Sequence, residues 1–420
     1  MNVPEEVIEL KDDAIGLNGW FVVDSTVRGR SCGGIRMLPG VTEREVRDLA
    51  RAMTLKQGFM GVPRGGAKSG IIVEKDATDE TKTLFLNRFG ELLRERIISE
   101  DYIPGPDMGT STQLMKGMYE HIGKPVYKRS TGSPRSGELT SVAVYITVEV
   151  AFELIGKTMH GAVVAVEGFG AVGSALAKSL HKAGVRVVAV STVDGAIYDE
   201  HGLDIDDVLM IRDRFITEHS TVPDSQPEDA WILQYEKAEQ LPKEQLLELP
   251  VDILCPCGRS GQINENNMQA IKALAICSGA NNPVTEAAEM YLHDNDHMYL
   301  PDFVTNCGGV LGNMMEFAGL SDGTIDQVLR NFLGKQLKEI VNISKRTRRS
   351  PYSIGVEIAE KNFQRMKEAD ERKRKTGVLK RAGVVAYKRG FVPPWIARRV
   401  ALREIDSMLS GNEAIFSAFQ

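Results

Sequence analysis

The hydrophobic pattern after Thr42 predicts an amphipathic helix. Thr42 followed by Glu45 is typical of a capping box at a helix start. Apolar residues then recur at helical spacing, with charged residues on the other side. These apolar positions are Val46, Leu49, Ala50, Met53 and Met60. We expect the helix to end within 58–63, where two glycines and a proline occur.

A second pattern, in which apolar strands and helices alternate, begins at Gly161. Residues 162–167 predict a buried strand, which is followed by a helix ending at Ala183 and a second strand at 185–190. Between the first strand and the helix lie Gly168, Phe169, Gly170, Ala171, Val172 and Gly173. Such a G-x-G-x-x-G sequence between a strand and a helix predicts a dinucleotide site, because its glycines permit a tight turn and the helix N-terminus receives the pyrophosphate.

Three further apolar runs, at 251–255, 273–278 and 303–305, predict more strands of the same parallel sheet. Ligands of open parallel sheets bind beyond the carboxyl ends of the strands. Asn281 and Asn306, which follow the second and third of these runs, are therefore candidates to face a nicotinamide ring.

The residue that reads the adenosine ribose is usually acidic and lies about 20 residues beyond the glycine motif. Thr192 occupies the corresponding position, and the nearest acid, Asp194, comes two residues later. The sequence therefore leaves NAD and NADP as alternative cofactors.

The remaining pattern predicts strands at 19–24 and 71–73, a helix at 83–98, and a long helix from Thr140 to Ile155. We expect an α/β fold with two domains and an active-site cleft between them, because 420 residues exceed one ordinary core. The expected boundaries are 1–137 for a substrate-binding and catalytic domain, 138–345 for a Rossmann dinucleotide-binding domain, and 346–420 for a helical segment that packs back toward the first domain.

Composition narrows the function classes. The hydrophobic content of 42%, the charged content of 26% and the net charge of −6 describe a globular protein with no indication of nucleic-acid binding. Five cysteines without zinc-site spacing indicate a reducing compartment. The acidic N-terminus lacks a signal-peptide pattern, and no apolar run approaches the ~20 residues of a membrane span. We therefore expect a cytoplasmic protein without a membrane partner or a metal; His293 and His297 are interpreted as part of a polar loop.

Two lysines provide the first indication of chemistry. Lys56 lies at the edge of the apolar stripe of the first helix, and Lys68 follows Gly65-Gly66, where we expect the backbone to turn close to a ligand. If both amines share a poorly hydrated wall, desolvation and mutual repulsion depress the pKa of at least one of them, which makes it a base near neutral pH. A small anion such as a carboxylate would need such a wall. The alternative is that both lysines are surface residues.

Asp107 is the candidate carboxylate. Pro104 and Pro106 stiffen its approach, and we expect it on a loop at the start of the next helix, where its direction can be fixed. It could instead be only the cap of that helix. Gly33-Gly34 beside Arg36 indicates either backbone close to a ligand or an ordinary turn.

Together these pieces resemble the glutamate/leucine/phenylalanine/valine dehydrogenases over most of the chain. The matching segments occur in the family's order: Gly33-Gly34-Ile35-Arg36, Met53-Thr54-Leu55-Lys56, Gly65-Gly66-Ala67-Lys68, Pro106-Asp107-Met108-Gly109-Thr110, Glu138-Leu139-Thr140, Gly168 to Gly173, Gly279-Ala280-Asn281 and Asn306-Cys307-Gly308-Gly309-Val310.

The resemblance implies reversible, NAD(P)-dependent oxidative deamination of an L-amino acid to a 2-oxo acid and ammonia by a homo-oligomer, a hexamer or another assembly. It implies that Lys56 binds the α-carboxylate, that Lys68 activates the water that attacks the imine, and that Asp107 carries protons to and from the amino nitrogen. Thr140 and Asn306 would help to hold cofactor and substrate.

Two departures concern the substrate side chain. Glutamate-specific members carry a lysine just before the Gly-Gly pair and a serine seven positions after the residue that matches Asn306, where this chain has Cys32 and Asn313. A buried carboxylate that loses its cation is costly. Cys32 and Asn313 therefore predict a neutral or uncommon substrate side chain. With Lys56 and Gly34 they are the candidate substrate-binding residues. The alternatives are a glutamate dehydrogenase in which Arg36 or Arg135 replaces the lysine, and a catalytically silent paralogue that senses an amino acid or nucleotide.

Overall fold

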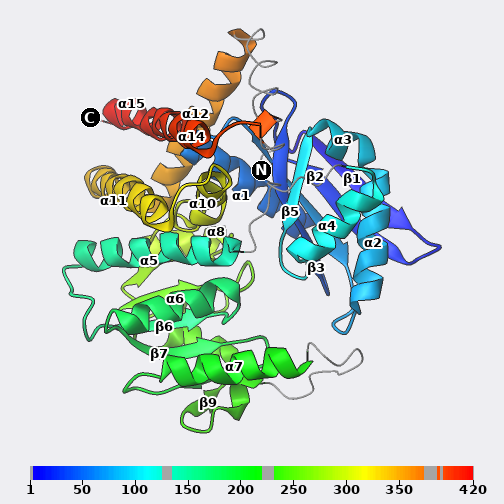
Figure 1. Cartoon of the computed structure of the whole chain (residues 1–420). Coiled ribbons are helices and arrows are strands. Elements are labelled where there is room, and N and C mark those ends of the chain that lie inside the picture. The colour runs from blue at the N-terminus through cyan, green and yellow to red at the C-terminus, as the bar shows by residue number, and fades with distance from the viewer. Residues whose placement is uncertain (1–2, 125–134, 220–230, 373–385, 388–390, 420) are drawn as a thin grey trace. The chain divides into compact units, whose positions relative to one another are not determined.

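The computed structural model describes residues 3–124, 135–219, 231–372, 386–387 and 391–419, which form two compact α/β units (Figure 1). The first unit comprises Met1–Pro134, Asn313–Asp322 and Val356–Gln420, and the second comprises Arg135–Gly312 and Gly323–Gly355. Among the described residues, no helix is both long and apolar enough to cross a membrane.

The first unit is built on a five-stranded mixed sheet of order β1-β2-β4-β3-β5. Strand β2 runs antiparallel to its neighbours β1 and β4, whereas β3 runs parallel to both β4 and β5. The strands are β1 Glu6–Asp12, β2 Leu17–Val23, β3 Ser31–Leu38, β4 Gly65–Ile72 and β5 Tyr102–Pro106.

Strand β4 corrects the prediction of a turn at Gly65-Gly66 followed by a short strand at 71–73. The glycines lie inside the strand at the centre of the sheet. They are needed because a helix packs directly on them: a Cβ on Gly66 would lie 2.3 Å from the carbonyl oxygen of Ala50. The expected turn is therefore absent, and the close approach that these glycines permit is that of α1 to the strand.

Helices cover both faces of this sheet (Figure 1). Helix α1 (Glu43–Met60) packs on one face, where Val22 joins Val46 and Ala50. The capping prediction is confirmed, since the Glu45 amide donates to Thr42 Oγ1 at 3.2 Å. The other face packs against α2 (Asp79–Leu92), α3 (Arg94–Ser99) and α4 (Thr112–His121). The helix predicted at 83–98 is thus divided at Leu93 into α2 and α3.

The C-terminal helices close over the end of α1. Asn362 in α12 (Pro351–Arg372) donates to the carbonyl oxygen of Gly58 at 2.7 Å, and Asn412 donates to that of Phe59 at 2.9 Å. Gly58 is required at this contact, because a Cβ there would lie 2.4 Å from the carbonyl oxygen of Ala359. The elements after α12 are α14 Pro394–Leu409, η4 Ser410–Asn412, α15 Glu413–Phe416 and η5 Ser417–Phe419.

The second unit contains a seven-stranded sheet of order β12-β11-β10-β6-β7-β8-β9, which is parallel from β12 to β7. Its strands are β6 Val163–Glu167, β7 Arg186–Ser191, β8 Ala196–Tyr198, β9 Glu239–Leu241, β10 Ile253–Pro256, β11 Ala275–Ile276 and β12 Met298–Tyr299. The strands predicted from the first four apolar runs are confirmed as β6, β7, β10 and the shorter β11. Its helical elements are α5 Ser136–Leu154, α6 Ala171–Lys182, α7 Ile205–His219, η1 Trp231–Gln234, η2 Lys243–Glu248, η3 Met268–Ala270, α8 Glu286–Asp294, α9 Asp302–Thr305, α10 Gly308–Phe317 and α11 Asp322–Thr347, of which α10 and α11 continue across the division between the units.

The strand predicted at 303–305 is wrong. These residues form the short helix α9, which begins after Pro301, and the edge strand is β12. Phe303, Val304 and Thr305 are all fully buried in α9. A short helix that is buried all round shows the same unbroken apolar run as a buried strand, so the pattern alone does not separate the two.

Candidate active site

Lys68 projects from the middle of β4 toward the face that α1 covers. Alternate residues of a strand share a face, and Gly66 and Gly70 on either side of Lys68 both contact α1 or its approach. The Lys68 side chain is only 2% exposed, and its Nζ forms an ion pair with Asp107 Oδ2. The surface alternative is therefore wrong for Lys68.

Asp107 lies on a loop as expected, but this loop position comes directly after β5 rather than at the start of α4. Helix α4 begins at Thr112, and its N-cap is Ser111, whose Oγ accepts from the Leu114 amide at 3.2 Å. Asp107 is therefore not the cap of that helix. Its Oδ1 instead accepts from Arg36 Nε and from the Met108 amide, each at 2.8 Å.

Gly34 makes room for this carboxylate. Gly34 pairs with Gly105 in the β3–β5 ladder, and a Cβ on Gly34 would lie 2.8 Å from the Cβ of Asp107. No real Cβ makes so short a contact, so a larger residue at position 34 would displace the Asp107 side chain. The Gly33-Gly34 pair thus does not form a turn. Gly34 instead leaves room for the side chain of Asp107.

The surroundings of this pair lower both pKa values, but for different reasons. Burial raises the pKa of Asp107, but the positive charges of Lys68 and Arg36 and the hydrogen bonds from both lower it to well below its usual range. Burial lowers the pKa of Lys68, and Arg36 lowers it further, while Asp107 opposes the shift. The site therefore favours an ionised carboxylate beside an amine that gives up its proton more readily than a free lysine.

Arg36 is the functional candidate whose contacts sequence reasoning missed. Its side chain is buried in the sheet–helix interface, where Nη1 donates to Glu45 Oε1 at 2.7 Å while Nε holds Asp107. One feature of the sequence could have indicated these contacts. Arg36 lies two residues after Gly34 in the same strand, so its side chain is on the face that α1 covers, and the first turn of α1 is acidic. A buried cation in such a place needs carboxylate partners.

Lys56 and Cys32 form a second part of the site under the C-terminal half of α1. Lys56 is 5% exposed, so the surface alternative is wrong for this lysine as well. Burial raises the pKa of the Cys32 thiol, and the nearby charges of Arg64 and Lys56 partly oppose the rise. Gln57 Nε2 donates to Cys32 Sγ at 3.1 Å. The amide oxygen of Gln57 is buried and finds no hydrogen-bond partner among the described residues.

The glycine motif lies at the β6–α6 turn, where the sequence placed a dinucleotide. Gly168 adopts φ +85°, and a Cβ on Gly173 would lie 1.9 Å from the Gly168 carbonyl oxygen. Gly170 is the N-cap of α6 without a side-chain cap, and a Cβ there would meet open space. The α6 amides are thus presented to a ligand, as a phosphate group requires. The Phe169 side chain is buried against Trp231 and its amide donates to the Ser191 carbonyl oxygen at 2.7 Å, so neither group faces a ligand.

Two predicted cofactor residues meet at the end of β11. Asn306 caps the C-terminus of α9 rather than ending a strand, and its Nδ2 donates to Asn281 Oδ1 and to the Ala280 carbonyl oxygen, each at 2.9 Å. The Asn306 Oδ1 atom is buried, and no described residue donates to it. It could accept from a carboxamide such as that of nicotinamide.

The other predicted positions lie in simpler surroundings. Thr192 follows β7, and its Oγ1 accepts from the Asp194 amide at 3.2 Å in a tight turn. Thr140 lies in the first turns of α5, where its Oγ1 donates to the Ser136 carbonyl oxygen at 2.8 Å. Asn313 is half-buried on α10. Within the described ranges, no three His, Cys, Asp or Glu side chains gather closely enough to hold a metal ion.

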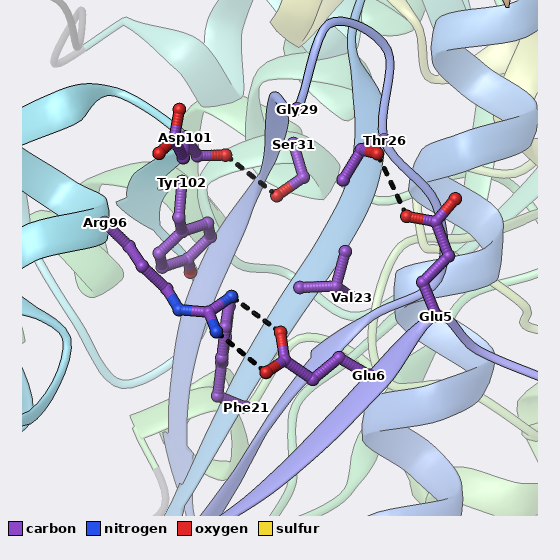
Figure 2. A pocket seen from close by; sticks show the side chains of 10 residues that line it. All are labelled: Glu5, Glu6, Phe21, Val23, Thr26, Gly29, Ser31, Arg96, Asp101 and Tyr102. Carbon is purple, nitrogen blue, oxygen red and sulfur yellow. Dashed lines mark hydrogen bonds and ion pairs between the residues drawn. The ribbon is translucent and has the colours of Figure 1, made fainter.

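A pocket of about 310 Å³ lies elsewhere in the first unit (Figure 2). Figure 2 shows Arg96 and Glu6 joined by two hydrogen bonds, with Phe21 and Tyr102 beside Arg96. It lies on the face of the sheet opposite α1, and neither lysine nor Asp107 lines it. It is therefore separate from the Lys68–Asp107 site. Its lining residues are Glu5, Glu6, Phe21, Val23, Thr26, Gly29, Ser31, Arg96, Asp101 and Tyr102.

Comparison with known proteins assigns both halves of the chain to one family. Residues 4–124 match the model described as "Glu/Leu/Phe/Val dehydrogenase, dimerisation domain", and residues 132–374 match "Glutamate/Leucine/Phenylalanine/Valine dehydrogenase". A glutamate dehydrogenase of Thermotoga maritima is 34% identical over 343 residues, which are 77% of this chain and 78% of that protein. An NAD-specific glutamate dehydrogenase A of Halobacterium salinarum is 32% identical over 74% of this chain and 71% of its own length.

Solved structures show the same fold. The hetero-hexameric glutamate dehydrogenase of Thermus thermophilus in its Leu-bound form aligns with a TM-score of 0.70 and 25% identity, covering 89% of this chain and 90% of that chain. The L-tryptophan dehydrogenase of Nostoc punctiforme aligns with a TM-score of 0.58 and 21% identity, over 87% of this chain and 97% of its own.

Proposed function

Because the chain belongs to the glutamate/leucine/phenylalanine/valine dehydrogenase family of NAD(P)-dependent amino-acid dehydrogenases, we propose that it catalyses reversible oxidative deamination of an L-amino acid. The products are a 2-oxo acid and ammonia. The observation that carries this proposal is the buried Lys68–Asp107 ion pair, in which Arg36 also holds the carboxylate. A lysine with a lowered pKa next to a fixed carboxylate is suited to proton transfer near neutral pH.

Each member of the site has one task in the proposed reaction. Lys56 binds the α-carboxylate of the amino acid. Asp107 receives and returns the protons of the amino nitrogen. Lys68, in its neutral form, removes a proton from the water that attacks the imine carbon, and as an ammonium it stabilises the resulting carbinolamine. Ammonia then leaves with a proton supplied through Asp107.

The second unit supplies the cofactor residues of the proposal. The backbone amides at the start of α6 have no side-chain cap and can donate to a pyrophosphate. The Asn306 Oδ1 atom, to which no described residue donates, can accept from the carboxamide of a nicotinamide ring. NAD or NADP supplies the hydride acceptor for the amino-acid Cα. At Thr192 no acidic side chain is present to select against a ribose phosphate.

We propose a neutral or uncommon substrate side chain. Cys32 places a thiol where glutamate-specific members of the family carry a lysine. The two arginines that could replace this lysine, Arg36 and Arg135, already have carboxylate partners. Arg36 pairs with Asp107 and Glu45, and Arg135 pairs with Glu138 at 2.8 Å.

Glutamate is the second candidate, and a specific observation favours it. Arg64 is the residue before β4, and its positive charge lies near the Cys32 thiol, whose pKa it lowers. Gly65 pairs with Ser31 in the β3–β4 ladder, which brings Arg64 next to the start of β3. A guanidinium there could receive a side-chain carboxylate. The relatives named above that act on glutamate are consistent with this candidate.

A substrate panel tests the proposal. Purified protein is mixed with each of the twenty L-amino acids and NAD⁺ or NADP⁺, and reduced cofactor is measured by absorbance. We expect turnover with at least one neutral amino acid above that with glutamate. Turnover best with glutamate selects the second candidate. Cofactor binding without turnover on any substrate contradicts the dehydrogenase activity and favours a sensing role.

We also propose that the protein is a homo-oligomer. The first unit matches a model described as a dimerisation domain, and the Thermus thermophilus relative is hetero-hexameric. Light scattering after size-exclusion chromatography gives the mass directly. A mass equal to the 46.2 kDa chain contradicts the proposal.

A further inference from the structure

Alternating charges connect α1 to the candidate catalytic pair. Glu45 in the first turn of α1 accepts from Arg36 Nη1 at 2.7 Å, and Arg36 Nε reaches Asp107 Oδ1 at 2.8 Å. Asp107 then pairs through Oδ2 with Lys68. Four charged side chains, from α1, β3, β4 and the loop after β5, thus form one chain of contacts, in which Arg36 and Lys68 are almost completely buried.

The two oxygens of Asp107 have different partners. Oδ1 accepts from Arg36 and from the Met108 amide, whereas Lys68 is the side chain that contacts Oδ2 in the described part of the chain. The planar guanidinium can hold Glu45 and Asp107 at once, which a lysine ammonium cannot do with the same geometry. The carboxylate plane is therefore set by Arg36, and Oδ2 is the oxygen left to exchange a proton.

We propose that Arg36, itself held by Glu45, is a positioning residue that orients Asp107 and sets the proton affinity of the Lys68–Asp107 pair. This inference rests on the proposed function, because it assigns Arg36 and Glu45 a part in the same reaction. Neither residue contacts the amino acid in this role.

The charged groups around Asp107 determine the sign of the expected effects. Lys68 faces it from β4, Arg36 from β3, the Tyr102 hydroxyl from β5, and Glu45 acts from α1 through Arg36. Removing the cation Arg36 raises the pKa of both Asp107 and Lys68. Removing the anion Glu45 lowers both, because its charge opposes that of Arg36.

The test compares the pH dependence of kcat/KM in wild type, Arg36→Gln and Glu45→Gln with the best substrate from the panel. In Arg36→Gln we expect the acid limb to move up by about one pH unit or more. In Glu45→Gln we expect it to move down by roughly half a unit. The signs hold whichever member of the pair the limb reports, because both pKa values move in the same direction.

Glu43→Gln is the matched control. Glu43 lies in the same first turn of α1, but its carboxylate pairs with Arg47 at the surface. We expect its acid limb to coincide with that of wild type. Opposite shifts in the two test variants are not produced by a general structural defect. Unshifted limbs, or limbs that move in the same direction, overturn the proposal.

Arg36→Lys separates charge from geometry. This variant keeps the positive charge, so the acid limb of its pH profile should stay near that of wild type. Its kcat should fall about tenfold, because a lysine ammonium cannot hold Glu45 and Asp107 in the geometry of the guanidinium. The KM for the amino acid should change less than kcat, since Arg36 does not bind substrate. A rise in KM at constant kcat contradicts a positioning role.

Two further measurements keep the outcome decisive. If Arg36→Gln does not fold, the proposal is tested by Glu45→Gln alone. An acid limb of kcat/KM that moves up, or does not move, in that variant overturns the proposal. If the panel gives no turnover, the proposed function fails, but the coupling is still tested by melting temperatures. Arg36→Gln should then destabilise the protein more when Asp107 is present than in an Asp107→Asn background, and equal losses overturn the coupling.

Discussion

Lys68 and Asp107 form an ion pair that is largely buried: only 2% of the Lys68 side chain and 14% of the Asp107 side chain are exposed to solvent. Removing two charges from water is costly, and such a pair is rarely a net source of stability. The chain nonetheless keeps a third charge, Arg36, on the same carboxylate. Because burying these three charges is costly, we interpret the cluster as part of a catalytic site rather than as a source of stability.

Replacing Gly34 by alanine should disable the site without greatly weakening the fold. The added Cβ would lie 2.8 Å from Asp107 Cβ and 3.2 Å from its Oδ2, so the carboxylate must move. We expect kcat to fall at least about tenfold, at a stability cost of roughly 1–3 kcal/mol. Steady-state kinetics and thermal unfolding measure the two effects.

Gly105→Ala is the control for that experiment. Gly105 pairs with Gly34 in the β3–β5 ladder, but a Cβ there would meet nothing within 4 Å. Its kcat should stay within about twofold of wild type. Equal losses in both variants would show that strand substitution, rather than displacement of Asp107, is the cause.

The stability of the protein should depend on pH through Asp107. Its folded pKa lies below the unfolded value of about 3.9, so its contribution is fully present above that value and is lost as pH falls. The difference in melting temperature between wild type and Asp107→Asn should therefore be largest near neutral pH and should narrow toward pH ~3. Asp206→Asn, a substitution of an exposed residue in α7, serves as the comparison. A wild-type advantage that does not change with pH would contradict an ionised Asp107 in the folded state.

Arg64→Gln should distinguish the two substrate candidates. If the physiological side chain is neutral, kcat/KM for the best neutral substrate should change less than about threefold. Residual activity with glutamate should fall at least about tenfold, because a hydrogen bond to a charged group contributes roughly 1.5–3 kcal/mol. Arg44→Gln, at an exposed arginine in α1, should alter neither activity. A large loss with the neutral substrate alone would contradict the assignment of Cys32 and Arg64 to the side-chain subsite.

Local signals in the sequence were sufficient for the start of α1 and for the turn at the glycine motif. Thr42 and Glu45 marked the start of α1 because a cap depends on neighbours within one turn. The place of Lys56 at the edge of a helical stripe left burial and exposure as alternatives, and the structure shows that it is buried. Gly168 and Gly173 were read correctly because both act within a single strand–turn–helix unit.

Contacts between distant segments could not be predicted in this way. Arg36 and Asp107 are 71 residues apart, and no periodicity indicates that β5 lies beside β3. The strand character of Gly65-Gly66 was hidden because glycine disfavours strands unless another element must approach closely, as α1 does here. Phe303–Thr305 was mistaken for a strand because three buried residues in a row fit either element.

The central claim is that the buried amine of Lys68 performs the chemistry of amino-acid deamination. Lys68→Ala tests it most directly, with Lys116→Ala, which removes a half-exposed lysine of α4, as the control. The account predicts that formation of reduced cofactor falls at least about 1000-fold in Lys68→Ala, while the Kd for NAD(P)⁺ stays within about twofold and Lys116→Ala retains full activity. Activity of Lys68→Ala within tenfold of wild type would contradict it.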